Sequence, residues 1–298
     1  RRQVDLLVRT LPYVAEEECF ALKGGTAINL FVRDLPRLSV DIDLTYLPIA
    51  DRDQSLAEID NALRRICTRV KSVMKGITVT ESTPATQHTI NKLILRTPDR
   101  VQIKIEVTPV LRGCVYAPKT MTICGKAEDQ FGFAEISVLS FADLYAGKIL
   151  ATLDRQHPRD LFDIHQLLEN EGINDELRTA LVVYLISHDH SPHTLLSPAA
   201  RDITHDYERN FLGMTEEDVV VETLLATRTA LVNNVVSNMS EDHRHFLVSF
   251  YRRKPEWSLL GLDHLDQLPA VRWRELNLDK AGEETRADIV RKLEDVLW

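Results

Sequence analysis

The sequence predicts an α+β protein (α/β-like) in which a region of alternating strands and helices precedes a mainly helical region. Before residue 140, several short segments alternate apolar and polar residues, which is typical of half-buried strands, and segments with helical spacing lie between them. After Ser140, helical spacing dominates and few β-branched alternations remain. The 298 residues, 44% of them hydrophobic, suffice for a sizeable core in one large domain or two of ordinary size.

In the first region we expect helices and strands in alternation. Residues 4–18 place their apolar side chains on one helical face, which Pro12 interrupts. Further helices are expected at residues 26–35 and 53–73. The expected strands are residues 19–25, 38–47, 76–82, 89–97, 101–110 and, at the edge of the sheet, 120–125.

In the second region we expect helices almost throughout. Ser140 and Asp143 have the spacing of a capping box and predict a helix start there. Pro158 predicts another start, because proline is favoured in the first turn of a helix. Beyond residue 171 the sequence reads mainly as helix to its end.

Charge and cysteine usage narrow the class of protein. A net charge of −9 argues against coating nucleic acid through the overall field, although a local basic groove remains compatible with it. No apolar run approaches the roughly 20 residues of a membrane helix, so we expect no membrane association. The scattered cysteines lack metal-ligand spacing and predict thiols in a reducing cytoplasm; they are Cys19, Cys67, Cys114 and Cys124.

Two glycines precede the helix expected at residues 26–35. Gly24 and Gly25 follow a strand, so backbone N–H groups at the helix start can bind a phosphate, and the Thr26 hydroxyl can add a hydrogen bond. An ordinary strand-to-helix turn is the competing interpretation.

Two aspartates follow on the next strand. Alternation places Ser39, Asp41 and Asp43 on one face. Carboxylates about 7 Å apart on one face repel each other unless a cation lies between them, and Mg²⁺ prefers such oxygen ligands. A solvated edge strand is the alternative. A nucleoside triphosphate with Mg²⁺ would explain the glycines and the aspartates together.

The strand expected at residues 101–110 carries a third carboxylate. Glu106 can bind a second metal ion or take a proton from an attacking hydroxyl. Lys104 shares its face and can pair with an acid or a phosphate. A half-solvated strand with a salt bridge is the alternative.

Charged residues also mark the start of the helical region. Lys148 and Arg155 lie two turns apart, which predicts a basic stripe facing out of an otherwise apolar helix. Asp160 follows Pro158, and Asp163 lies one turn later. The alternatives are an exposed helix lysine and an aspartate placed for helix capping.

Four motifs together resemble a known family. "GGT…SVDIDL", "KIEV", "DLYAGKILATLDR" and "RDLFDIHQLL" occur in that order between about residues 20 and 170. They resemble the AbiEii-type nucleotidyltransferases, the toxin arm of type IV toxin–antitoxin and phage-abortive systems, in the DNA polymerase β-like superfamily. The resemblance implies a nucleotidyltransferase domain of residues 1–168, with a mixed β-sheet flanked by helices, and a helical C-terminal domain of residues 169–298. The helical half matches in general character only.

The resemblance also implies roles for individual residues. Thr26 stands where the superfamily often has serine, and the gap to Asp41 is longer than in its minimal members. The implied metal ligands, for a two-metal Mg²⁺ site, are Asp41, Asp43 and Glu106. The implied catalytic set adds Lys148 and Asp160, with Asp160 supporting Lys148 or an arginine. The implied NTP-binding residues are Lys23, Gly24, Gly25, Thr26, Ser39, Lys104, Lys148 and Arg155.

The implied activity is transfer of a nucleoside monophosphate from an NTP to an acceptor. The family points to the 3′ end of tRNA, whose modification blocks translation, and to a cognate antitoxin encoded nearby. We expect a monomer. Two alternatives stay open: transfer to a protein or small-molecule hydroxyl, and a non-catalytic module that only binds NTP.

Two further segments suggest sites but have simpler interpretations. Residues 188–193, "HDHSPH", suggest a transition-metal site, whereas a solvated linker is favoured by Ser191 and Pro192. Residues 246–257 mix aromatic side chains with Arg252 and Arg253 and suggest an RNA contact, whereas a solvent-facing helix end explains them as well.

Overall fold

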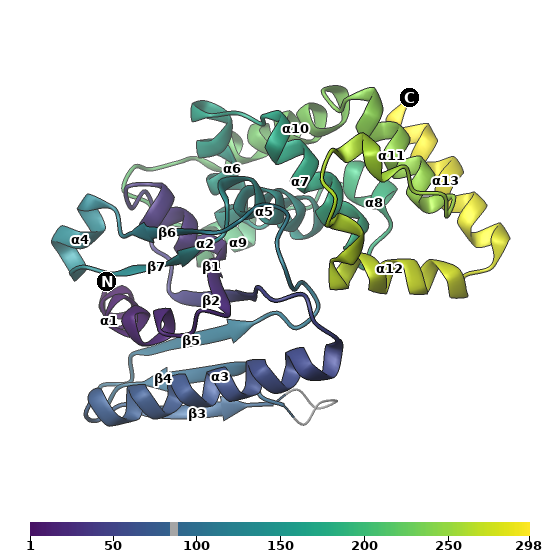
Figure 1. The fold of residues 1–298 in the computed structure, drawn as a ribbon. Helices are drawn as coiled ribbons and strands as arrows, with labels where there is room; N and C mark the ends of the chain where they lie inside the picture. Colours follow the sequence, from purple (N-terminus) through teal and green to yellow (C-terminus); the bar gives the residue numbers. More distant parts are fainter. Residues whose placement is uncertain (84–88) are drawn as a thin grey trace. The chain divides into compact units, whose positions relative to one another are not determined.

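The computed structural model describes residues 1–83 and 89–298, which form two compact units, Arg1–Ser140 and Phe141–Trp298 (Figure 1). The first unit contains a β-sheet with flanking helices, and the second consists mainly of helices. This confirms the predicted α+β class. The predicted boundary after residue 168 lies inside helix α6 (Pro158–Asn170) of the second unit, and as a functional division it stays a prediction.

In its described residues, the first unit forms a seven-stranded sheet with the order β3-β4-β5-β2-β1-β7-β6. Strand β2 runs parallel to β5 and antiparallel to β1, and β1 runs parallel to β7, so the sheet is mixed as predicted. The strand expected at an edge is indeed an edge strand, β6. The strands are β1 Phe20–Lys23, β2 Asp41–Tyr46, β3 Thr78–Ser82, β4 Lys92–Arg96, β5 Gln102–Val107, β6 Lys119–Thr122 and β7 Glu135–Val138.

Two long helices cover part of this sheet. Helix α1 (Arg2–Ala15) packs against β5 and β7, and α3 (Arg52–Val73) packs against β3 and β4 (Figure 1). The expected interruption at Pro12 is wrong, because this residue lies within the last turn of α1. Proline there removes one helical hydrogen bond, while Leu11 and Val14 keep the helix anchored in the core.

Other differences concern short elements. The helix expected at residues 26–35 begins earlier, as α2 (Gly24–Ala27), and continues as a π-helix at Ile28–Val32. Helix α4 (Gly125–Phe131) and strand β7 were not predicted. A strand of four residues contains too few positions to reveal a period of two.

The central strands have one apolar and one polar face, as their alternation predicts. The buried positions of β2, β4 and β5 are Ile42, Leu44, Leu93, Leu95, Ile103, Ile105 and Val107. The positions between them are partly exposed, and they include Asp41, Asp43, Lys92, Lys104 and Glu106. All the predicted charges of these strands therefore lie on one face.

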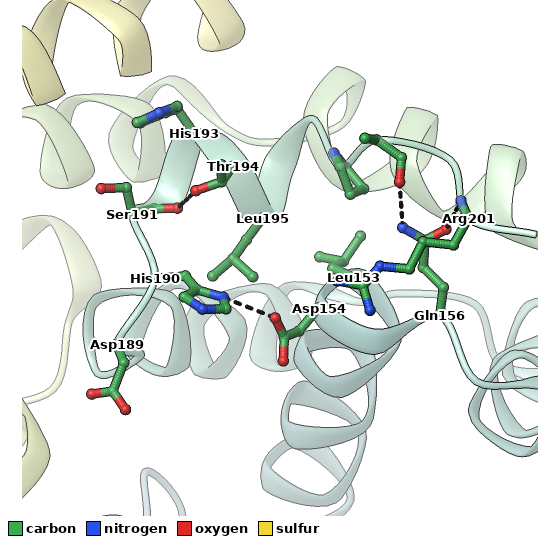
Figure 2. A pocket seen from close by; sticks show the side chains of 12 residues that line it. Leu153, Asp154, Gln156, Asp189, His190, Ser191, His193, Thr194, Leu195 and Arg201 are labelled. Carbon is green, nitrogen blue, oxygen red and sulfur yellow. Dashed lines mark hydrogen bonds and ion pairs between the residues drawn. The ribbon is translucent and has the colours of Figure 1, made fainter.

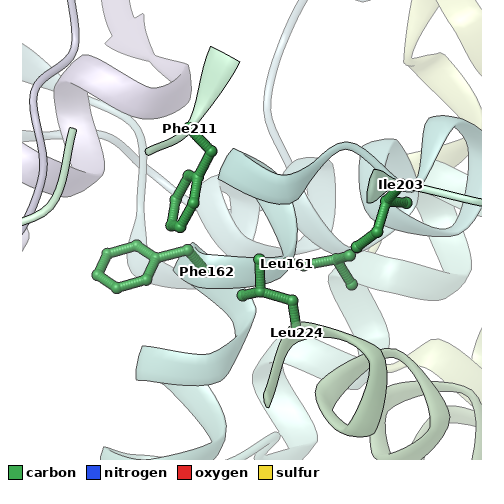
Figure 3. Close-up of a cluster of buried hydrophobic side chains, with 5 residues drawn as sticks. All are labelled: Leu161, Phe162, Ile203, Phe211 and Leu224. Atoms are coloured by element: carbon green, nitrogen blue, oxygen red, sulfur yellow. The ribbon is translucent and has the colours of Figure 1, made fainter. Parts of the chain in front are cut away.

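The second unit is mainly helical, as predicted. Helix α5 packs against α6 and α7, and the buried side chains of Leu161, Phe162, Ile203, Phe211 and Leu224 join α6 and α10 to the chain between them (Figure 3). The helices are α5 Phe141–Arg155, α6 Pro158–Asn170, α7 Asp175–Ile186, α8 Pro192–Leu196, α9 Thr204–Asn210, α10 Val221–Ser237, α11 Glu241–Tyr251, α12 Pro269–Lys280 and α13 Glu283–Leu297.

Two findings bear on the class of protein. Among the described residues, no helix combines the length and the apolar character that crossing a membrane requires. The thiol of Cys67 is buried, and those of Cys19 and Cys124 are partly exposed. The reducing compartment stays a prediction.

A buried ion-pair cluster joins the end of α1 to α3. Glu17 is 6% exposed and accepts hydrogen bonds from Arg65 at 2.7 Å and from Arg69. Burial raises the pKa of Glu17, but the hydrogen bonds and charges of the two arginines outweigh it and hold that pKa below its ordinary value of 4.5. Ionised Glu17 therefore stabilises the fold.

We predict that Glu17→Gln lowers the free energy of unfolding by about 2 kcal/mol at neutral pH, because hydrogen bonds to a charged group are lost. The lowered pKa means that this stabilisation is present above the unfolded value and disappears as pH falls through the folded one. Urea unfolding at pH 7 and at acidic pH should show the gap between variant and wild type shrinking below pH 4.5.

The matched control is Glu16→Gln, whose carboxylate is 55% exposed and 3.2 Å from Arg69. We expect it to cost less than about 1 kcal/mol, as exposed ion pairs do. Equal losses for the two variants would contradict the role given to Glu17.

Candidate functional site

Asp43 lies in a row of charged residues that crosses four strands. Its Cα pairs with Lys23 on β1 and with Glu106 on β5, and Glu106 pairs with Lys92 on β4. Residues paired laterally in a sheet point to the same face. The fold therefore brings two of the predicted carboxylates, Asp43 and Glu106, side by side.

Lys104 joins the third predicted carboxylate to this row. Its Nζ lies 3.5 Å from Asp41 Oδ2 and 3.6 Å from Glu106 Oε2, while Lys92 Nζ lies 3.2 Å from Glu106 Oε1. These four side chains are 30–40% exposed, so they are accessible to a ligand. Lys92 is missing from the sequence prediction, although the β4–β5 hairpin pairs Arg96 with Gln102 and so places Lys92 opposite Glu106.

The electrostatics of the row centre on Asp43. Burial raises the pKa of Asp43, the charges of Asp41 and Glu106 add to this, and Lys23 and Lys104 oppose it. Burial also lowers the pKa of Lys23, against the effect of the two nearest carboxylates. The lysines thus compensate the negative charge of Asp43 only in part, and an added cation would stabilise the ionised carboxylate.

The two glycines are required by close contacts with this site. Gly24 has a φ of +73°, and a Cβ at this residue would lie 2.8 Å from Asp43 Oδ2. A Cβ at Gly25 would lie 2.8 Å from Arg37 Nη2 and 3.0 Å from Ser39 Oγ. The glycine turn and the aspartate strand, both predicted from the sequence, are therefore in direct contact.

Thr26 fastens the turn to the strand. It is fully buried, and its hydroxyl donates to the Asp41 carbonyl at 2.5 Å and lies 3.0 Å from Ser39 Oγ. Ser39 precedes strand β2 instead of belonging to it. The predicted hydrogen bond from Thr26 to a phosphate stays a prediction, and in the structure this hydroxyl holds Asp41 in place.

In the second unit, Lys148 lies between two aspartates. Its ammonium group is 2.7 Å from Asp160 Oδ1 and 2.9 Å from Asp163 Oδ2. All three side chains are at least nine-tenths buried. The expected outward-facing basic stripe is therefore wrong for Lys148, because α6 packs against the face of α5 that carries it.

Arg155 completes this cluster from the exposed side. Its Nε lies 2.6 Å from Asp160 Oδ2, and its side chain is 60% exposed. Burial raises the pKa of Asp160, but the charges of Lys148 and Arg155 and their hydrogen bonds outweigh it and hold that pKa well below its ordinary value. The predicted contacts of Asp160 with Lys148 and with an arginine are both present.

The carboxylates of the first unit have suitable chemistry for magnesium. Asp41, Asp43 and Glu106 offer hard oxygen donors on two adjacent strands, and the charge at Asp43 is undercompensated. Within the described residues, no three His, Cys, Asp or Glu side chains are grouped closely enough to hold a metal ion as they stand. The donor set fits a divalent cation in type and charge, and metal binding stays a prediction.

The two remaining candidate segments make contacts within the protein. Residues 188–193 belong to no metal-binding group among the described residues, and His190 instead pairs with Asp154 at 2.8 Å. In the segment 246–257, Arg252 pairs with Glu294, while the aromatic rings stack in the core of the unit. That segment is packed on its aromatic side, and the RNA contact stays a prediction.

Comparison with known proteins identifies the family. The model of a family described as "Nucleotidyl transferase AbiEii toxin, Type IV TA system" matches residues 5–273. No curated protein matches the chain. Among solved structures, MenT4, a nucleotidyltransferase toxin from Mycobacterium tuberculosis H37Rv, is similar in fold, with a TM-score of 0.61 and 14% identity over 98% of this chain and 92% of that chain. Since the family model spans most of the sequence, the chain belongs to the AbiEii family of nucleotidyl transferase toxins of type IV toxin–antitoxin systems.

Proposed function

We propose that this protein transfers a nucleoside monophosphate from an NTP to the 3′ end of tRNA and thereby blocks translation. The observation that carries the proposal is the contact of Gly24 with Asp43, with Glu106 on the neighbouring strand and Asp41 two residues before. The glycine turn suits phosphates, and the carboxylates beside it suit Mg²⁺. An NTP with bound Mg²⁺ brings phosphates and metal to the same place.

Asp41, Asp43 and Glu106 would hold two Mg²⁺ ions. When bound, the ions supply positive charge that polarises the α-phosphoryl group and offsets the charge of the leaving pyrophosphate. The backbone at Gly24 and Gly25 grips the triphosphate, and Lys23 and Lys104 add positive charge beside it. Thr26 and Ser39 keep the turn on the strand.

The chemistry is an in-line displacement at the α-phosphorus. The acceptor hydroxyl oxygen forms the new P–O bond, and the bond to the β-phosphate oxygen breaks, so pyrophosphate leaves. The hydroxyl proton passes to Glu106 or to water. Orientation of the two substrates and charge stabilisation supply most of the rate enhancement.

The resemblance assigns Lys148 and Arg155 to NTP binding, and we propose that the cluster of the second unit supplies a phosphate-binding cation. Lys148 is buried against two carboxylates, whereas Arg155 is largely exposed, so Arg155 is the cation of this cluster that a ligand can reach. Asp160 orients both cations. We assign Lys148 to holding Asp160 and Asp163 and, through them, the position of Arg155.

The biological setting follows from the family. We propose a cytoplasmic monomer that is controlled by an antitoxin encoded nearby. Transfer to a protein hydroxyl, and NTP binding without transfer, are outcomes that the labelling experiment below separates.

We predict that Asp41→Asn and Asp43→Asn each reduce transfer by at least about 100-fold, because each removes a charge that holds the metal ions. Purified protein is incubated with each α-³²P-labelled NTP, Mg²⁺ and total tRNA and resolved on a denaturing gel. Asp129→Asn, on the exposed side of α4, is the control and should leave labelling unchanged.

Label on tRNA with the wild type, lost in both site variants, supports the proposal. Label on protein instead would make the acceptor a protein hydroxyl. Full labelling by either site variant, or no label anywhere, would refute the catalytic mechanism.

The glycine contacts generate a second prediction. Gly24→Ala should lower kcat at least about tenfold, because its φ is left-handed and its Cβ would displace the Asp43 carboxylate. Gly25→Ala should cost less, since its nearest atom is the flexible end of Arg37. Steady-state kinetics with melting curves measure both variants, and the reverse order of effects would contradict the geometry.

A third prediction separates the two cations of the second unit. Lys148→Met should reduce stability by about 3 kcal/mol or more, because it leaves Asp160 and Asp163 buried without their shared cation. Arg155→Gln should change stability by only about 1 kcal/mol yet raise the KM for NTP several-fold. Should Arg155→Gln keep a normal KM while a folded Lys148→Met raises it, the assignment would be reversed.

A further inference from the structure

A cavity of about 550 Å³ lies within the helical unit (Figure 2). Its walls come from the end of α5, from the chain at residues 189–191, from α8 and from residues 198–201. Pockets for small ligands have volumes of this order. This one is large enough for a single nucleotide.

The cavity combines an apolar floor with polar groups at its rim. Leu153 and Leu195 are nearly fully buried and form the floor. The His190 ring lies beside Leu195 with Nδ1 2.8 Å from Asp154 Oδ1, and the Arg201 side chain reaches in from the opposite side (Figure 2). A planar ring, a carboxylate and a guanidinium therefore face one space.

One wall is held in a strained conformation. Gln156 is 2% exposed and has a φ of +53°, which is uncommon for a residue other than glycine. Its amide donates to the Ala199 carbonyl at 2.7 Å and accepts from the Arg201 backbone N–H at 3.0 Å and from Arg228 at 3.2 Å. Such over-determined strain is typical of ligand-binding walls, and it fixes the backbone of Arg201 beside the cavity.

We propose that this cavity binds one unpaired ribonucleotide of the RNA acceptor. The helical unit would then distinguish RNA from DNA. The proposal rests on the proposed transfer to RNA. The base lies on Leu195 and stacks against the His190 ring, since base–aromatic stacking tolerates any sequence. The Arg201 guanidinium binds the phosphate, and the Asp154 carboxylate accepts a hydrogen bond from the 2′-hydroxyl.

The role of Asp154 gives the proposal its sharpest consequence. Only RNA carries the 2′-hydroxyl, so Asp154 would distinguish RNA from DNA, whereas Arg201 would bind the phosphate of either. Replacing Asp154 should remove the preference for RNA. Replacing Arg201 should weaken the binding of RNA and of DNA equally.

The test uses the full chain without NTP and measures fluorescence anisotropy of a labelled single-stranded oligoribonucleotide and of its DNA counterpart. Wild type should bind the RNA more tightly. Asp154→Asn should weaken RNA binding about tenfold, to the level of DNA, as expected for one lost hydrogen bond to a charged group. Arg201→Ala should weaken the binding of RNA and of DNA by the same factor. The matched control is Glu169→Gln, at an exposed position of α6.

A pair of substitutions at His190 guards against a simple folding defect. His190→Ala should weaken RNA binding, and His190→Phe should restore it, because phenylalanine keeps the stacking surface. The proposal is overturned if wild type does not prefer RNA, or if Asp154→Asn binds RNA and DNA as the Glu169→Gln control does.

The tRNA-labelling experiment is run in parallel to keep the two proposals separate. If tRNA is labelled and Asp154→Asn keeps the preference for RNA, the proposed role of the cavity is refuted while the proposed transfer to tRNA stands. If protein is labelled in place of tRNA and Asp154→Asn loses the preference for RNA, transfer to tRNA is refuted. The cavity is then supported as an RNA-binding site.

Discussion

The close approach of the Gly24 backbone to the Asp43 carboxylate is the constraint on which the site depends. A Cβ at Gly24 would lie 2.8 Å from Asp43 Oδ2, and the positive φ of this residue turns the chain from β1 into α2 at that point. The antiparallel pairing of β1 with β2 then fixes Lys23 beside Asp43, and the parallel pairing of β2 with β5 fixes Glu106 on the other side. The contact between backbone and carboxylate and the register of the sheet together set the geometry of the site.

This arrangement of charges lowers the stability of the fold. Burial and two like charges raise the pKa of Asp43, so its ionised form is held against an unfavourable field. Hydrophobic residues would pack on this face at lower cost, as they do on the opposite face of the same strands. Residues that lower the stability of the fold are expected where a site must bind a charged ligand. A bound cation would offset this loss of stability, and the proposal of a metal-bound nucleotide draws its physical support from these charges.

The sequence predicted those parts of the fold that depend on local periodicity. Alternation placed Asp41, Asp43 and Glu106 on polar faces, because the side-chain period of a strand is two. It could not reveal that Lys148 is buried, since helical spacing defines a face but not the element that packs on it. Lys92 was missed because cross-strand partners follow from the register of the whole sheet, and β7 was missed because four residues are too few to reveal a period of two. The resemblance to a family supplied the link between Lys148 and Asp160, which no local pattern contains.

The corner between α5 and α6 joins two charge systems through consecutive residues. Arg155 bonds to Asp160 and so belongs to the Lys148 cluster, while Gln156 bonds to Ala199 and Arg201 at the wall of the cavity. A displacement of either residue must move the other, because the positive φ of Gln156 leaves the chain little freedom at this corner. If the cavity holds a nucleotide and Arg155 a phosphate, any effect of binding at one place on the affinity of the other must be equal in both directions. The corner between α5 and α6 thus places the two charge systems one residue apart in the chain.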